Sequence, residues 1–210
     1  MSKSNKYGYS GVDIPTQAFE ANVGKFDPDE INELVAEGKW TTFGQLELIE
    51  TQTASSVTTL AFTTLGSYNV HFLTHSYLES STTNVRYGVR FYESGVLHTG
   101  SDYRWAYSQQ LDSGSTSDFY DNSKSSIPIQ LEQPTGAQGG GYTYFYNLQD
   151  ATQYSVITNQ HNRSTGGIIA EIGGGVLTED SEVTGFQISG YDSSSAAFSG
   201  TFSLYGIKEY

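Results

Sequence analysis

The chain contains no cysteine, which excludes disulfide bridges, thiolate catalysis and thiolate zinc sites. It is also poor in positive charge, with 10 Lys and Arg against 23 Asp and Glu and a net charge of -13 at pH 7. Nucleic acid and anionic membrane surfaces both require a basic patch, so neither is expected as a partner. No stretch approaches the ~20 apolar residues of a membrane span, and the N-terminus lacks the apolar core of a secretory signal. We therefore expect a protein that is made in the cytoplasm and does not insert into a membrane.

Sequence motifs for catalysis are missing as well. The chain has no GxSxG elbow, HExxH pair, P-loop or dinucleotide fingerprint, so we expect no enzyme activity and no cofactor. A glycosidase would need two carboxylates facing each other about 5–10 Å apart. Glutamates are available on the predicted strands or their ends, but no pair stands out: Glu47, Glu93, Glu132 and Glu171. A polysaccharide-degrading enzyme is therefore the weakest of three functional hypotheses.

Aromatic residues are abundant, with 16 Tyr and 11 Phe, and from Trp40 onward apolar residues recur with a period of two. This period is typical of half-buried β-strands. The pattern predicts ten strands at 45–50, 57–65, 68–75, 85–93, 103–108, 142–148, 154–158, 168–172, 183–189 and 198–208, with all four prolines outside them. Residues 41–210 are thus expected to form one all-β domain, an antiparallel β-sandwich or jelly roll.

The last predicted strand, Phe198–Lys208, is long and apolar enough to lie beside an early strand such as Gln45–Glu50. A strand this close to a terminus is ordered only if a sheet holds it. We therefore expect the first and last strands of the β region to close one sheet together.

Residues 1–40 differ from the rest. The first 25 are polar and aperiodic, and they are followed by one helix signal at Pro28–Glu37, with Asp27 as N-cap and Gly38 as stop. We interpret this region as an N-terminal arm with a short helix, which packs on its own domain or docks on a partner. The candidate anchor side chains are Tyr7, Tyr9, Ile14, Phe19, Ile31 and Leu34.

Two patterns could hold a metal, but neither is strong. His71 and His75 share a strand face, and His98 or His161 could join them, although strand histidines are usually structural. Asp112, Asp118 and Asp121 lie in a Ser/Gly-rich predicted loop that could wrap calcium, yet the ligand spacing of an EF-hand is absent. Solvated loop carboxylates explain these aspartates better, so we assign no metal site.

An aromatic cluster surrounds the longest predicted loop and is the candidate ligand site. Exposed rings beside amides and carboxylates are suited to stacking on sugars, while alternating rings on one strand face can equally belong to the core. The candidates are Tyr103, Trp105, Tyr107, Phe119 and Tyr120. A carbohydrate-binding module is the second functional hypothesis.

The C-terminal half resembles the jelly-roll domains of tailed-phage virion proteins, particularly those of marine phages. The resemblance rests on GYTYFYNLQDATQYSVIT, IIAEIGGGVLTEDSEVTGFQISG and AAFSGTFSLYGIKEY. The N-terminal YGYSGVDIPTQ and GKFDPDEINELVAEGKW also resemble the leader of phage structural proteins. The resemblance covers most of the chain. Its motifs indicate a fold and a virion protein, and they do not indicate a catalytic site.

This resemblance implies a virion surface protein: a capsid decoration (knob or cement) protein or a fibre-like, receptor-binding adhesin. The implied partners are the major capsid protein or another virion protein, and in addition a host surface glycan. The chain lacks the long shaft of a fibre, which favours the capsid over the tail. Residues 1–40 hold 4 basic and 7 acidic residues and the β region 6 and 16, so the arm would face the particle and the acidic head the solvent. The oligomeric state is not implied.

Overall fold

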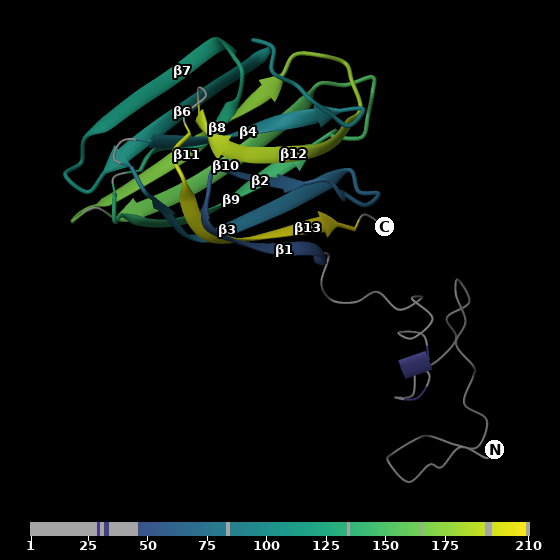
Figure 1. Cartoon of the computed structure of the whole chain (residues 1–210), viewed down its shortest axis with the longest axis horizontal. Helices are drawn as coiled ribbons and strands as arrows, with labels where there is room; N and C mark the ends of the chain where they lie inside the picture. Colours follow the sequence, from purple (N-terminus) through teal and green to yellow (C-terminus); the bar gives the residue numbers. More distant parts are fainter. Residues whose placement is uncertain are drawn as a thin grey trace, which may run out of the picture. The chain divides into compact units, whose positions relative to one another are not determined.

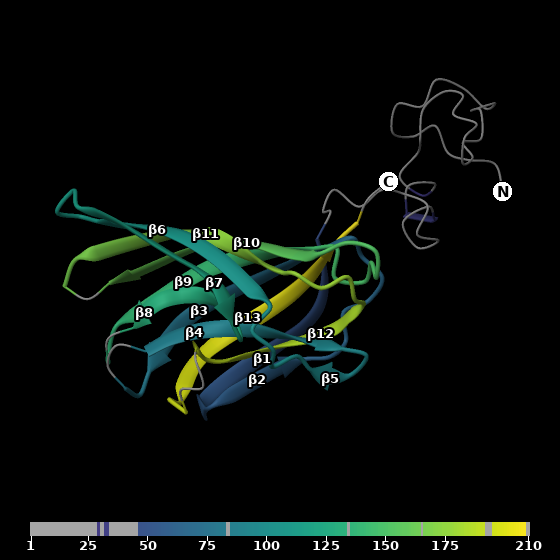
Figure 2. The ribbon, with the colours of Figure 1, turned by 90° about the horizontal axis from the view of Figure 1, so that it is seen from above.

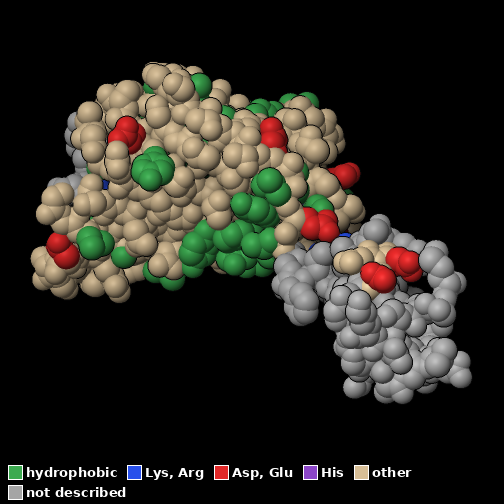
Figure 3. All heavy atoms as spheres, turned by 90° about the horizontal axis from the view of Figure 1, so that it is seen from below, with side chains coloured by type: hydrophobic (Ala, Val, Ile, Leu, Met, Phe, Trp, Pro, Cys, Tyr) green, Lys and Arg blue, Asp and Glu red, His purple; other side chains and the backbone are tan. Residues whose placement is uncertain are grey.

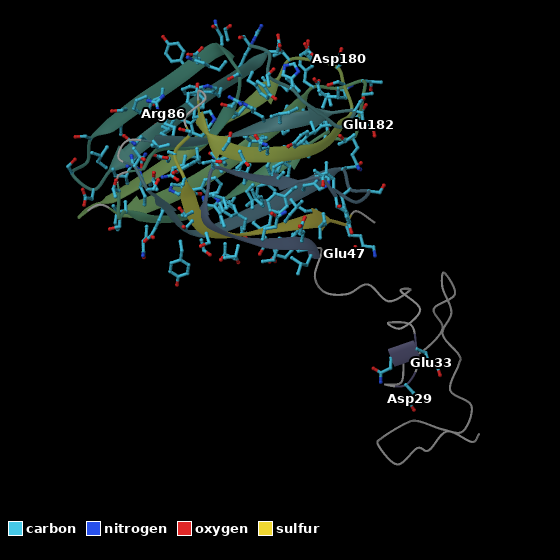
Figure 4. All side chains as sticks on the ribbon, in the orientation of Figure 1. Asp29, Glu33, Glu47, Arg86, Asp180 and Glu182 are labelled. Atoms are coloured by element: carbon cyan, nitrogen blue, oxygen red, sulfur yellow. The ribbon has the colours of Figure 1, made fainter. Side chains whose placement is uncertain are left out.

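The computed structural model describes Asp29, Asn32 and Glu33, and, in the β domain, residues 46–82, 85–133, 135–164, 166–191 and 195–208. The chain divides into two units, Met1–Gly44 and Gln45–Tyr210. Asp29, Asn32 and Glu33 are helical and exposed, within the predicted helix (Figure 4). The candidate anchors Tyr7, Tyr9, Ile14, Phe19, Ile31 and Leu34 lie outside the described residues. Within the described part, no helix is long and apolar enough to cross a membrane.

The second unit is a sandwich of two antiparallel sheets (Figures 1 and 2), as predicted. The large sheet has eight strands in the order β1 (Leu46–Val57), β13 (Phe198–Ile207), β3 (Val70–Ser80), β9 (Gln138–Tyr146), β10 (Ser155–Ser164), β11 (Ile168–Leu177), β6 (Tyr103–Leu111) and β7 (Thr116–Lys124). The small sheet has five, in the order β2 (Thr59–Phe62), β12 (Val183–Gly190), β4 (Val85–Glu93) and β5 (Val96–Leu97), with β8 (Ile127–Gln133) also paired to β4.

Alternation along the strands divides each sheet into an inner and an outer face. On β13, buried and half-buried residues alternate without a break from Phe198 to Ile207. The inner rings meet between the sheets, where Phe186 of β12 stacks on Phe62 and Phe145 with centroids 5.1 and 4.6 Å apart. Burial of such rings is the main term that holds two sheets together.

The strand Phe198–Ile207 lies beside β1, as the sequence indicated. The register runs from Leu46 opposite Ile207 to Val57 opposite Phe198, with a bulge between Leu48 and Glu50. On its other side β13 pairs with β3. The strand is therefore an interior member of the large sheet, which holds it through backbone hydrogen bonds on both edges.

Three strands were not predicted. The polar segment 111–126 was expected to be a loop, but most of it forms β7, which pairs with β6 at the edge of the large sheet. Pro128 was placed outside the strands but lies in β8 opposite Gly88. The third is the two-residue β5. Pairing with a neighbouring strand, and not hydrophobic alternation, defines β7 and β5, whereas β8 does alternate, with Ile127, Ile129 and Leu131 all buried, around Pro128.

Candidate functional site

The predicted aromatic cluster is divided by the structure into core residues and surface residues. Tyr103, Trp105 and Tyr107 are 0, 6 and 4% exposed and belong to the hydrophobic core. Their alternation on β6 points all three inward, so the core interpretation holds for them and they offer almost no surface to a ligand. Phe119 packs against the core from β7, and Tyr120 is 81% exposed.

A hollow of about 290 Å³ lies where β7 crosses the rim of this core. Its lining combines aromatic rings with charges of both signs: Arg86, Trp105, Asp118, Phe119, Tyr120, Asp121, Lys124 and Tyr191. Trp105 donates its indole N–H to the Tyr191 hydroxyl at 3.1 Å, which fixes one wall, and the Arg86 guanidinium lies 5.7 Å from the Phe119 ring centroid. The hollow therefore offers ring faces beside charged hydrogen-bonding groups.

A larger feature, which the sequence analysis missed, is the outer face of the large sheet. Side chains that are opposite one another across paired strands form two apolar rows on this face. The first row is Leu46, Ile207, Val70, Tyr146, Val156 and Val176, and the second is Leu48, Tyr205, Phe72 and Tyr144, which ends opposite the polar Thr158. We call these residues the outer apolar face. None of them is charged, and viewed from below, hydrophobic side chains gather in one patch on the β sandwich (Figure 3).

The outer apolar face is solvent-accessible and its rings contact one another. Leu46 is 47% and Leu48 60% exposed, while the rings between them and β10 are half-buried against their neighbours. The Phe72 ring lies 4.7 Å from that of Tyr144 and 6.2 Å from that of Tyr205, with interplanar angles of 36° and 39°. Contiguous exposed apolar surface of this kind marks interaction sites in soluble proteins.

The inner face of the same sheet carries polar side chains below β8. The edge of β8 that is not paired to β4 has its backbone groups bound by these side chains. Asn159 donates to the Ile129 carbonyl at 2.8 Å, Tyr107 donates to the Pro128 carbonyl, and the Leu131 N–H donates to Glu171 at 2.9 Å. These bonds satisfy an edge that would otherwise be buried without partners.

Glu171 is the centre of this polar layer. It is 1% exposed, and its Oε1 accepts hydrogen bonds from Gln109 at 3.0 Å and from Arg163 at 3.3 Å. A carboxylate buried with a guanidinium and three hydrogen bonds is a structural group, because both of its oxygens accept hydrogen bonds from fixed donors. Glu171 is thus not available as a catalytic carboxylate.

Three of the histidines considered as ligands, His71, His75 and His161, are also structural. His71 bonds the Leu65 carbonyl at 2.8 Å, while His75 Nε2 lies 2.8 Å from His161 Nδ1. Burial lowers the pKa of His75 to about 4, and burial, with His75 and Arg163 nearby, lowers that of His161 well below its usual value. Both rings are therefore neutral at pH 7, and His98 lies apart from them at the end of β5.

The aspartates considered for calcium have separate roles. Asp112 accepts the Ile168 N–H at 3.1 Å, and Asp121 accepts the backbone N–H groups of Asn122 and Ser123. Among the described residues, these carboxylates do not converge to within ligand distance of one another. Backbone hydrogen bonds also hold the pKa of Asp121 below its usual value, with Lys124 adding to the effect.

Comparisons with other proteins add no assignment. No protein-family model matches the chain, no curated protein matches it, and no solved structure matches it.

Proposed function

We propose that the protein is a non-enzymatic attachment protein of a virion surface, a capsid decoration protein in the first instance, whose β sandwich docks on another protein. The observation that carries this proposal is the outer apolar face, which spans β1, β13, β3, β9 and β10 without a charged side chain. The resemblance to phage structural proteins suggests that the partner is the major capsid protein or another virion protein.

A protein surface fits this face better than a sugar does. Most members are aliphatic, and the Phe72 ring is inclined to the rings of Tyr144 and Tyr205, by 36° and 39°. Sugars stack on single exposed rings flanked by polar groups, whereas inclined rings and branched aliphatic side chains interdigitate with those of another protein. Residues 1–40 would supply a second anchor in this proposal.

Cosedimentation with virus particles stripped of this protein tests the proposal. The variant Leu48→Ser with Tyr144→Ser removes one exposed and one half-buried side chain of the outer apolar face. We expect its affinity for the particles to fall at least tenfold. Val96→Ser is the matched control, because Val96 is 71% exposed on the small sheet and lies off this face.

Circular dichroism and thermal unfolding of each variant establish that the fold is intact. Equal binding by the double variant and the wild type would remove the outer apolar face from the proposal. Deleting residues 1–25 measures the arm separately, and undiminished binding would remove the arm as an anchor. Self-association of the free chain, seen by light scattering, would redirect the proposal to an interface between copies.

The hollow at Trp105 supports a second candidate function, carbohydrate binding by a receptor-binding head. Tyr120 offers an open ring face, and Asp118, Asp121 and Arg86 offer hydrogen-bonding groups beside it. Glycan-array binding by the wild type that is lost in Tyr120→Ala would support this function. Absence of signal from the wild-type chain would overturn it.

A further inference from the structure

We propose that Glu93, His98 and Glu179 form a binding site for a divalent first-row transition-metal ion such as Zn²⁺. The three side chains come from the end of β4, from the turn after β5, and from the segment between β11 and β12. One ligand atom of each, the Nδ1 of His98 and a carboxylate oxygen of each glutamate, lies within 4.8 Å of the other two. No other such group of three exists in the described part of the chain.

The separations between these atoms suit one small ion. His98 Nδ1 lies 2.5 Å from Glu93 Oε2 and 3.9 Å from Glu179 Oε2. Ligands about 2.0–2.2 Å from a tetrahedral zinc ion lie roughly 3.3–3.6 Å from each other. These two separations bracket this value and the two glutamate oxygens lie within 4.8 Å of each other, so side-chain rotations would place all three ligands on one ion, with one position left for water.

His98 is oriented for coordination through Nδ1. Its other ring nitrogen, Nε2, lies 3.0 Å from Asp102 Oδ2. A carboxylate that contacts the second nitrogen of an imidazole fixes the orientation of the ring, and an ion bound at Nδ1 would replace the present contact between Nδ1 and Glu93 Oε2. A Cβ at Gly100 would collide with both the Asp102 carboxylate and the His98 ring, so glycine is needed for this close approach.

Packing and hydrogen bonds with neighbouring residues hold His98, Glu93 and Asp102 in place. Tyr103, fully buried, packs edge-on against the His98 ring with centroids 5.4 Å apart. Ser181 donates to Glu93 Oε1, which turns Oε2 toward His98, and Thr178 bonds the Asp102 carbonyl through both its N–H, at 3.0 Å, and its hydroxyl, at 2.9 Å. The ligands are therefore positioned by hydrogen bonds that do not involve the ion.

The charges at this site favour a divalent cation. Three carboxylates lie within 4 Å of one imidazole: Glu93, Asp102 and Glu179. A divalent ion would offset two of these negative charges. Asp180 and Glu182 (labelled in Figure 4) follow Glu179 in the same segment between β11 and β12 and add negative potential.

The imidazole selects the class of metal. Ca²⁺ requires six to eight oxygen ligands and Mg²⁺ prefers oxygen and water, so neither gains from a histidine. Imidazole nitrogen with carboxylate oxygen suits Zn²⁺, Co²⁺ and Ni²⁺.

Isothermal titration calorimetry of the full-length, tag-free chain, freed of metal with a chelator, tests the site with Zn²⁺. We expect one ion per chain, and a loss of affinity of at least tenfold in both His98→Gln and Glu179→Gln. Asp102→Asn should weaken binding about tenfold, as expected for a residue that positions a ligand. Glu182→Gln is the matched control, because it removes a nearby charge and no ligand, and it should bind nearly as well as the wild type.

Co²⁺ gives an independent readout, since visible absorption bands typical of a four-coordinate ion should appear in the wild type and vanish in His98→Gln. Glu179 is 45% exposed, so Glu179→Gln remains informative if His98→Gln fails to fold. Absence of Zn²⁺ binding, or binding unchanged in both ligand variants, would overturn the proposal. Equal affinity for Ca²⁺ and Zn²⁺ would overturn the class of metal, because it would show a general acidic surface.

Discussion

The two sheets are held together by different chemistry in two regions of the interior. Below β2, β12 and β4 the sheets meet through hydrocarbon, with Phe186 stacked between Phe62 and Phe145. Below β8 they meet through Glu171, Arg163, Asn159 and Tyr107, which bind one another or the backbone of β8. The two regions differ because β8 pairs with β4 along only one edge. Its other edge is bound by polar side chains of the large sheet.

This comparison shows what buried polar groups do in this sandwich. An unpaired strand edge inside a protein costs free energy unless side chains satisfy it. The ion pair of Glu171 and Arg163 fixes the carboxylate that receives the Leu131 N–H. We therefore expect the polar region to be sensitive to the loss of any single member, and the apolar region to lose stability only in proportion to the volume removed.

The largest effect is expected for Glu171→Ala. It leaves Arg163 buried without its carboxylate and the Leu131 N–H without an acceptor, so the free energy of unfolding should fall by about 3–5 kcal/mol. Urea denaturation followed by tryptophan fluorescence measures the change. The double variant Arg163→Met with Glu171→Leu should lose less than the two single variants together, and strict additivity would contradict the pairing.

Acid should weaken the polar region next. Burial lowers the pKa of His75 to about 4 in the folded state, against about 6.5 in the unfolded chain. The stabilisation that His75 gives as a neutral ring is therefore fully present above pH 6.5. As the pH falls from 6.5 toward 4, the free energy of unfolding should decrease by about 3 kcal/mol. Denaturation at a series of pH values measures it, and His75→Leu with His161→Leu should flatten the profile. An equally steep profile in that variant would assign the acid sensitivity to other groups.

A moderate effect is expected in the apolar region. Phe186→Leu keeps the site apolar but removes ring volume between Phe62 and Phe145, so it should cost about 1–2 kcal/mol. The loss should be nearly the same at pH 5 and pH 7, because the ring that is removed carries no titratable group. A loss that varies with pH would show that the two regions are coupled.

The smallest effect is expected for an exposed counterpart of the buried ion pair. Lys208 Nζ lies 3.0 Å from Glu47 Oε1, and the two side chains are 46 and 41% exposed. Lys208→Ala should leave the free energy of unfolding unchanged within error, because water and salt screen such pairs. A loss comparable to that of Glu171→Ala would mean that burial does not decide the strength of these pairs.

The sequence predicts the sandwich because most strands alternate. Val85–Glu93 was predicted with the bounds of β4, and the β1–β13 pairing was also predicted. The strand β7 could not be found from its sequence, since it pairs only with β6 and carries almost no inward apolar residues. The predicted strand 168–172 stops before Gly173, yet this glycine lies within β11, where a Cβ would meet the Ala106 carbonyl and the Tyr107 ring.

The candidate sites were harder to predict than the fold. Trp105, Phe119 and Tyr120 do meet at one hollow, but sequence spacing could not show which rings of β6 face inward. The outer apolar face had one available signal, the run Tyr142–Tyr146, where aromatic residues occupy both faces of one strand. The cluster of Glu93, His98 and Glu179 had none, because its members are brought together from three separate segments.

The pairing of β1 with β13 has a consequence for how the protein is made. The side chains of Thr51 and Ser203 are hydrogen-bonded although the two residues are 152 positions apart. During synthesis, β1 therefore cannot pair with β13 until nearly the whole β domain has left the ribosome. Closing so long a loop is entropically costly and slows folding. We expect nascent chains released before Phe198 to leave β3 with an open edge, and to depend on chaperones until the last strand arrives.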